Sequence, residues 1–192
     1  MKYLYESFFD QREIGGMQVF CSKFLNPAFR LPLLEVTENW SQMAADARHG
    51  LAQAISLRDE PTVEDEAIAF FIVQDRELVS SIAPIFPRLA DRKRAIEELH
   101  RALEINAAPL ERLNVLQAIE EMGSTSSIQP LENSLTLFKQ LCDRDGRYYR
   151  EYFATAHALW RLTGGAIYRA EIQRHLQHTD RDVQKAAHEY ES

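Results

Sequence analysis

Cysteine, basic residues and long apolar runs are all scarce in this sequence. Only two of its 192 residues are cysteine, Cys21 and Cys142, and they form no Cys-x-x-Cys pair. A disulfide framework or a thiolate zinc site needs more cysteines, so we expect two reduced thiols. The longest apolar run, residues 67–73, is far shorter than the roughly twenty residues that cross a bilayer. Acidic Glu6 and Asp10 stand where a secretory signal would be apolar, so we expect a soluble, cytoplasmic protein with no membrane partner.

The shortage of basic residues restricts the kinds of partner. Lys and Arg number 22 against 29 Asp and Glu, which gives a formal net charge of −7. Nucleic-acid binding draws most of its nonspecific affinity from clustered Lys and Arg, so this balance argues against DNA or RNA. An acidic surface instead attracts basic proteins. A phosphate-binding loop is also missing, because Thr-Gly-Gly-Ala at 163–166 lacks the spacing and the following lysine.

Helical periodicity is present over most of the chain from about Glu38 onward. Apolar residues recur every three to four positions, which predicts helices in segments 38–57, 61–74, 91–105, 108–123, 124–141, 148–165, 166–178 and 180–191. Pro84 and Pro87 predict that a further helix in 76–90 is kinked or ends early. Residues 17–24 fit a short strand or the start of a helix, and the prolines of 25–36 favour an extended segment.

Two of these helices end in nearly the same phrase. Residues 118–123 read Ala-Ile-Glu-Glu-Met-Gly, and residues 158–164 read Ala-Leu-Trp-Arg-Leu-Thr-Gly. A truncated third copy, 183–190, matches the apolar pattern of 152–159. A helical pair has apolar residues on both sides and buries them only against neighbouring pairs, so this repeat favours a solenoid over an irregular bundle. The closing glycines predict left-handed helix caps.

The segments 158–165 and 180–190 together resemble the short prokaryotic HEAT repeat. That family combines an Asp or Pro turn, a Val-Arg-like start, small residues and Ala-Leu-Gly-x-Leu-Gly. The match covers about residues 90–190, is suggestive for 62–90 and is absent from 1–60. Glu120 and Trp160 depart from it, since the family usually has its first glycine there.

The resemblance implies an all-α fold, namely a short right-handed α-solenoid of HEAT-like helical pairs over 61–192. An irregular N-terminal segment, 1–60, would pack one helix on the solenoid within a single folding unit. The family binds partners along a curved face, and the likeness does not name the ligand. Trp160 has two interpretations: it fills a gap opened by the long insertion 138–152, or it marks the recognition face.

Metal and nucleophile patterns are weak. Di-iron enzymes of the HEAT-like class carry several His-Glu pairs, and this chain has one, His188–Glu189. His175 and His178 could share a metal with Asp180 or Asp182, but two histidines at a polar helix end are typical of solvated imidazoles.

Serines 124, 126 and 127 have no histidine nearby in sequence and are typical helix caps. We therefore expect no catalytic residue, no metal, no cofactor and no small-molecule ligand.

Two surface features remain as candidate partner-binding sites. The first is an acidic cluster, whose alternative interpretation is a solvated loop followed by a dipole-stabilised helix start. The second lies in 146–153, where Tyr and Arg have the composition of an interface and where Tyr149 and Phe153 belong to the core. The candidate residues are Asp59, Glu60, Glu64, Asp65 and Glu66 in the first feature and Arg147, Tyr148 and Tyr152 in the second.

These features predict a non-catalytic protein-binding module. An inhibitor or immunity-type protein that neutralises a basic partner, such as a bacterial toxin nuclease, fits the acidic charge and the missing catalytic pattern. Two alternatives stay open: a HEAT-like lyase or chaperone subunit that acts on a pigment or a modified protein, and a scaffold subunit of a larger complex.

Overall fold

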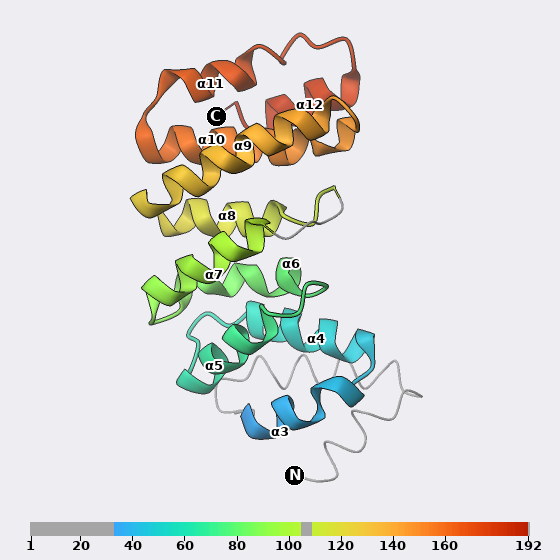
Figure 1. Ribbon diagram of the computed structural model, residues 1–192, viewed down its shortest axis with the longest axis vertical. Coiled ribbons are helices and arrows are strands. Elements are labelled where there is room, and N and C mark those ends of the chain that lie inside the picture. The colour runs from blue at the N-terminus through green and yellow to red at the C-terminus, as the bar shows by residue number, and fades with distance from the viewer. Residues whose placement is uncertain (1–32, 105–108, 192) are drawn as a thin grey trace. The chain divides into compact units, whose positions relative to one another are not determined.

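The computed structural model describes residues 33–104 and 109–191, and within them the secondary structure is helical, without a strand (Figure 1). The all-α prediction is therefore confirmed. The chain divides into two compact units, Met1–Ala95 and Ile96–Ser192, which are described separately. No helix in the described ranges is long and apolar enough to cross a membrane. The predictions for 17–24 and for Cys21 lie outside these residues, and the predicted boundary after residue 60 stays a prediction.

The described part of the first unit begins with two helices whose ends differ from the predictions. Helix α3 forms in part of the segment expected to be extended, because a proline restricts itself and the residue before it and leaves the following residues free. The predicted helix 38–57 is interrupted at Met43, whose backbone is extended. Trp40 explains the interruption: its ring packs edge-on against Phe71 at 5.3 Å, and its Nε1 donates to Asp75 at 3.3 Å. From residue 33 on, the helical elements of this unit are α3 (Leu33–Asn39), η1 (Trp40–Gln42), α4 (Ala45–Ser56), α5 (Val63–Ile72), α6 (Val79–Ile82), η2 (Ala83–Arg88) and the first turn of α7 (Arg92–Glu104).

The two prolines end a helix as predicted. Helix α6 stops at Ile82, and the chain continues as the 3₁₀ helix η2, which contains Pro84 and Pro87. The core of this unit is apolar and fully buried, with Leu51, Ile55, Ile68, Ile72, Ile82 and Phe86 among its residues.

The second unit is arranged around one central helix. Helix α10 packs against α8, α9, α11 and α12, and its Phe153, Ala156 and Leu159 are completely buried (Figure 1). Its helical elements, after the rest of α7, are α8 (Leu113–Met122), η3 (Thr125–Ser127), α9 (Ile128–Cys142), η4 (Gly146–Tyr148), α10 (Tyr149–Thr163), α11 (Ala166–Gln173) and α12 (Arg181–Glu189).

The repeated phrase ends two helices of this unit as predicted. Gly123 caps α8 at φ 63°, and Gly164 caps α10 at φ 68°, both in the left-handed region that a Cβ disfavours. The start of α8 differs from its prediction. It lies at Leu113, four residues after Pro109, because Leu110 has a φ of 77° that no helix continues through.

Candidate functional site

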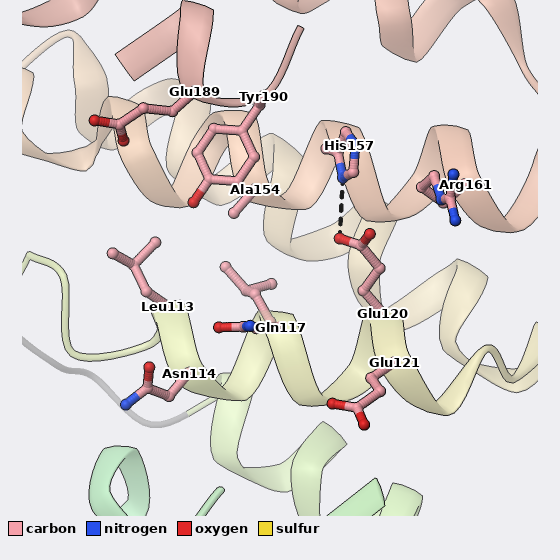
Figure 2. Close-up of a pocket in the computed structure, with 11 residues that line it drawn as sticks. Leu113, Asn114, Gln117, Glu120, Glu121, Ala154, His157, Arg161, Glu189 and Tyr190 are labelled. Atoms are coloured by element: carbon pink, nitrogen blue, oxygen red, sulfur yellow. Dashed lines mark hydrogen bonds and ion pairs between the residues drawn. The ribbon is translucent and has the colours of Figure 1, made fainter. Parts of the chain in front are cut away.

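A groove of about 800 Å³ opens in the second unit among α8, α10 and the end of α12 (Figure 2). These are the three helices that carry the repeated sequence pattern. The lining residues are Leu113, Asn114, Leu116, Gln117, Glu120 and Glu121 of α8, Ala154, His157 and Arg161 of α10, and Glu189 and Tyr190 at the end of α12.

The groove surface consists largely of the polar positions that alternate with the apolar stripe of the repeat. In α8 the stripe residues Val115, Ala118 and Ile119 are buried, whereas Gln117 and Glu121 are exposed. A 3.6-residue period places these two sets on different faces of one helix. Sequence reasoning followed the apolar stripe and missed this site; the polar residues between the stripe positions were the signal that marks it.

Carboxylates dominate the charge of the groove. Glu120, Glu121 and Glu189 line it together with one guanidinium, Arg161, and one imidazole, His157, and Glu189 also pairs with the guanidinium of Arg150. Glu120 Oε2 lies 3.0 Å from His157 Nδ1, and their side chains are 28% and 16% exposed, so this pair joins α8 to α10 inside the groove (Figure 2). Glu121 and Arg161 are exposed, and neither forms an ion pair within the described residues.

Aromatic rings surround the histidine. The rings of Tyr190 and Trp160 lie 5.9 and 5.6 Å from the imidazole of His157. Figure 2 shows the Tyr190 hydroxyl directed across the groove toward α8. Burial, and then the nearby Glu189 carboxylate, raise the pKa of Tyr190. Trp160 also stacks on the guanidinium of Arg169 at 4.8 Å, so the half-buried indole stands beside the groove.

A buried carboxyl group lies close to the start of α8. Glu151 of α10 is 0% exposed, and its Oε1 accepts the backbone N–H of Leu110 at 2.6 Å. Among the described residues its Oε2 has no hydrogen-bond partner. Burial raises the pKa of Glu151 to about 7. Arg112 is buried as well, which lowers its pKa, while the charge of Glu151 acts in the opposite direction.

The acidic cluster predicted as a docking surface is corrected at Asp65. Asp65 is 1% exposed, forms a capping box with Thr62 at the start of α5, and lies 3.5 Å from the equally buried Arg58. A carboxylate at this position stabilises the start of the helix, because it faces the first-turn N–H groups and a buried cation. Asp65 therefore cannot contact a partner.

The other four acids of that cluster are only partly available. The carboxylate of Glu66 accepts the backbone N–H groups of Ala90 and Asp91 at 2.8 and 3.3 Å, so it holds the turn before α7. Glu64 is half-buried. Asp59 and Glu60 are the members that lie fully at the surface.

The Tyr and Arg cluster at 147–152 is corrected at Tyr152. Its side chain is 2% exposed, because α10 has helices packed around it at this level, and its hydroxyl donates to Glu171 at 2.5 Å. Burial and this hydrogen bond raise its pKa. Tyr148 is half-buried with the guanidinium of Arg112 6.0 Å from its ring. Arg147 is exposed and forms a bidentate pair with Asp145, so the three residues do not form one surface.

Phe153 is buried as predicted, whereas Tyr149 is half-buried and its ring contacts both candidate metal ligands in a tilted arrangement. The rings of His175 and His178 lie 5.3 and 5.9 Å from the ring of Tyr149 and 5.8 Å from each other. Among the described residues, no three His, Cys, Asp or Glu side chains converge on a point that could hold a metal ion.

The structure also pairs a serine with a histidine that sequence reasoning did not connect. His100 Nε2 lies 2.9 Å from Ser127 Oγ, although 27 positions separate them. Ser127 is 0% exposed, and burial lowers the pKa of His100. A nucleophile needs access to its substrate, so this pair is a buried hydrogen bond that joins α7 to η3.

A smaller hollow of about 190 Å³ adjoins the start of α10 and is lined by three cationic side chains, Arg147, Arg150 and Lys185. Arg147 already pairs with Asp145, and Arg150 pairs with Glu189 at 3.1 Å. The hollow therefore has little net charge to offer an anion, and the groove is the stronger candidate.

Comparison with known proteins finds no family model, no curated protein and no solved structure that matches this chain. The class that the fold and the site define is an all-helical protein with a groove among α8, α10 and the end of α12.

Proposed function

We propose that this protein is a non-catalytic binding module that holds a basic segment of a partner protein in the α8–α10–α12 groove. The observation that carries the proposal is the groove itself, which three carboxylates line: Glu120 pairs with His157, Glu189 pairs with Arg150, and Glu121 forms no ion pair within the described residues. Carboxylates gathered in a concave site attract a cationic partner and steer its approach.

The proposed architecture is a short right-handed α-solenoid of HEAT-like helical pairs. The repeated apolar phrase supports it, as do the equivalent left-handed caps of α8 and α10. In such an arrangement equivalent helices would present equivalent faces, and the groove is lined by residues of the three helices that share the sequence pattern.

Within this class we favour an inhibitor or immunity-type protein for a basic partner such as a toxin nuclease. The net charge of −7 supports this choice, since an acidic surface can occupy the cationic cleft that otherwise holds nucleic acid. A cytoplasmic setting is part of the proposal, and the buried free thiol of Cys142 is compatible with it.

A charge-reversal experiment tests the groove. A fluorescein-labelled oligoarginine peptide is titrated with the protein at low and at physiological ionic strength, and binding is followed by fluorescence anisotropy. In the groove variant, Glu121→Lys with Glu189→Lys, we expect the affinity to fall at least about tenfold at low salt. Both side chains are exposed, and the ion pair that is lost, between Glu189 and Arg150, lies at the surface, so the variant should fold.

The matched control is Asp59→Lys with Glu60→Lys, two exposed acids of the first unit. It changes the net charge by the same amount but leaves the groove intact, so we expect an affinity loss below about twofold. Equal losses of affinity in both variants would show that the peptide responds to net charge alone. That result would contradict the groove as the binding site.

A further inference from the structure

We infer that Glu151 is a positioning residue that controls the groove through its protonation state. Its ionised carboxylate holds the start of α8 in the geometry that binds the partner, and we call this contact the latch. The link to binding rests on the proposed function. The contacts themselves lie within the second unit and can be tested without a partner.

A short chain of hydrogen bonds connects the carboxyl group to the groove wall. Glu151 Oε1 accepts the N–H of Leu110 at 2.6 Å, and the Leu110 carbonyl accepts the N–H of Leu113 at 3.3 Å. Leu113 and its neighbour Asn114 line the groove opposite Ala154 and His157 of α10. The bond from Glu151 to Leu110 thus fixes the start of α8 relative to α10.

Leu110 depends on this bond because its backbone conformation is unfavourable. Its φ of 77° is the only positive value at a non-glycine residue within the described ranges. A residue with a Cβ keeps such a conformation only where its surroundings hold it. The Leu110 side chain is 42% exposed, so its packing is incomplete, and the hydrogen bond to Glu151 is a restraint that holds the backbone in this conformation.

Glu151 changes its charge near neutral pH, whereas the buried titratable groups around it do not. Arg112 and Glu111 face it from the turn before α8, Cys142 from the end of α9, and Tyr190 from the end of α12. Burial raises the pKa of Cys142 to about 12 and also raises that of Tyr190, so both stay neutral. Arg112 stays cationic, since its pKa is lowered from a very high reference value.

The two protonation states hold the turn differently. The ionised carboxylate accepts the Leu110 N–H through a charge-assisted bond and balances the buried charge of Arg112. Protonation removes the charge that supports both effects. The turn from Leu110 to Leu113 then loosens, and the α8 wall of the groove moves with it.

Nuclear magnetic resonance of the full-length ¹⁵N-labelled protein tests the latch directly. We expect the Leu110 amide to titrate with a midpoint near the pKa of Glu151, about 7, and the amides of Leu113 and Asn114 to follow with the same midpoint. The isosteric Glu151→Gln variant should abolish this titration. A Leu110 amide that does not respond to pH would overturn the inference, as would Leu113 and Asn114 amides that do not follow it.

A second variant keeps the test decisive if Glu151→Gln does not fold. Glycine adopts a positive φ without strain, so Leu110→Gly removes the need for the restraint. In that variant the Glu151 carboxyl carbon should still titrate, whereas the Leu113 and Asn114 amides should lose their pH dependence. If they keep it, the coupling does not run through Leu110 and the latch is excluded.

The oligoarginine peptide then separates the latch from the proposed function. We expect its affinity for the wild-type protein to fall at least about threefold between pH 8 and pH 6, and this loss to persist in His157→Gln but to disappear in Leu110→Gly. If the peptide binds equally at both pH values while Leu110 titrates, the latch does not control the groove and the inference fails. If no peptide binds at any pH, the proposed function fails, and the amide titration alone decides the latch.

Discussion

At the scale of the single residue, the ionisation of Glu151 has two opposite consequences. It strengthens the local bond to Leu110. It also disfavours the folded state, because burial raises the pKa from the ordinary 4.5 to about 7. Between these values the unfolded chain releases its proton first, so the stability of the fold falls as the pH rises through the window. On the proposed function, binding is therefore expected to be strongest in a pH range in which this residue makes the fold less stable.

The first prediction concerns this stability cost. Raising the pH from about 4.5 to above 7 should cost the wild-type protein about 3 kcal/mol through Glu151, and Glu151→Gln should lack this component. The measurement is urea unfolding at pH 5 and pH 8, followed by Trp160 fluorescence in a Trp40→Phe background. Because other groups titrate in both proteins, the difference between the two pH profiles is the quantity of interest. Identical profiles would contradict the buried, ionisable state of Glu151.

The second prediction concerns Asp65, which the sequence pattern placed at the surface. Asp65→Ala removes the capping box of α5 and the carboxylate that faces buried Arg58, so we expect the first unit to lose about 3 kcal/mol or more. The matched change Asp59→Ala, at an exposed position of the same acidic stretch, should stay within about 0.5 kcal/mol of wild type. Chemical unfolding followed by Trp40 fluorescence in a Trp160→Phe background compares them. If both variants have similarly small effects, Asp65 is not a structural residue and could belong to the docking surface.

At the scale of the helix, local patterns predicted elements well wherever a helix end depends on its own residues. Gly123 and Gly164 end α8 and α10 where the sequence placed them. The ends that differ depend on distant contacts. The break at Met43 follows from Trp40 packing on Phe71, and α8 starts late because Glu151, 41 positions away, holds Leu110. A single sequence shows neither contact.

The third prediction tests the helix caps. Gly123→Ala and Gly164→Ala should each cost about 1 kcal/mol, because both residues have a positive φ while neither has an atom within 4 Å of an added Cβ. Gly146 is the matched control, since it too has open space around it but an ordinary φ. Gly146→Ala should be neutral or stabilise the protein by up to about 1 kcal/mol. Urea unfolding of the three variants makes the comparison, and equal costs at all three positions would point to crowding in place of backbone strain.

Helix periodicity also explains how much of the candidate site was predictable. The polar positions of α8 and α10 follow from the same repeat that marks their apolar faces, so Gln117, Glu121 and Arg161 were within reach of the sequence. The pairing of Glu120 with His157 was not, because it depends on how α8 and α10 are placed against each other. Tyr152 was wrongly predicted to be exposed, because α10 is covered by helices on several sides. The sequence of one helix does not show how many of its sides are covered by other helices.

At the scale of the whole molecule, the acidic charge is spread over both units, but the concave acidic site lies in the second. Asp59 and Glu60 add to the long-range field from the first unit, whereas Glu121 and Glu189 line the groove. The field of the whole chain governs how fast a basic partner arrives, and the contacts within the groove govern how long it stays. A functional assignment to the groove therefore requires that the second unit be able to work without the first.

The fourth prediction tests that requirement. The division between the units falls within α7, so a fragment must begin before this helix to keep its first turn, where Asp91 Oδ1 accepts the N–H of Arg94 at 3.0 Å. About a hundred residues can bury a core of their own, and Phe138, Phe153 and Leu159 supply one here. We expect the fragment 91–192 to unfold cooperatively in urea, as followed by Trp160 fluorescence, and to bind the oligoarginine peptide within about threefold of the full chain, the difference reflecting the lost charge of the first unit. A fragment that unfolds without cooperativity would mean that the groove needs the first unit for its stability. A fragment that folds but binds more than about tenfold more weakly would move part of the binding surface into the first unit, where Asp59 and Glu60 are the exposed acids of the cluster.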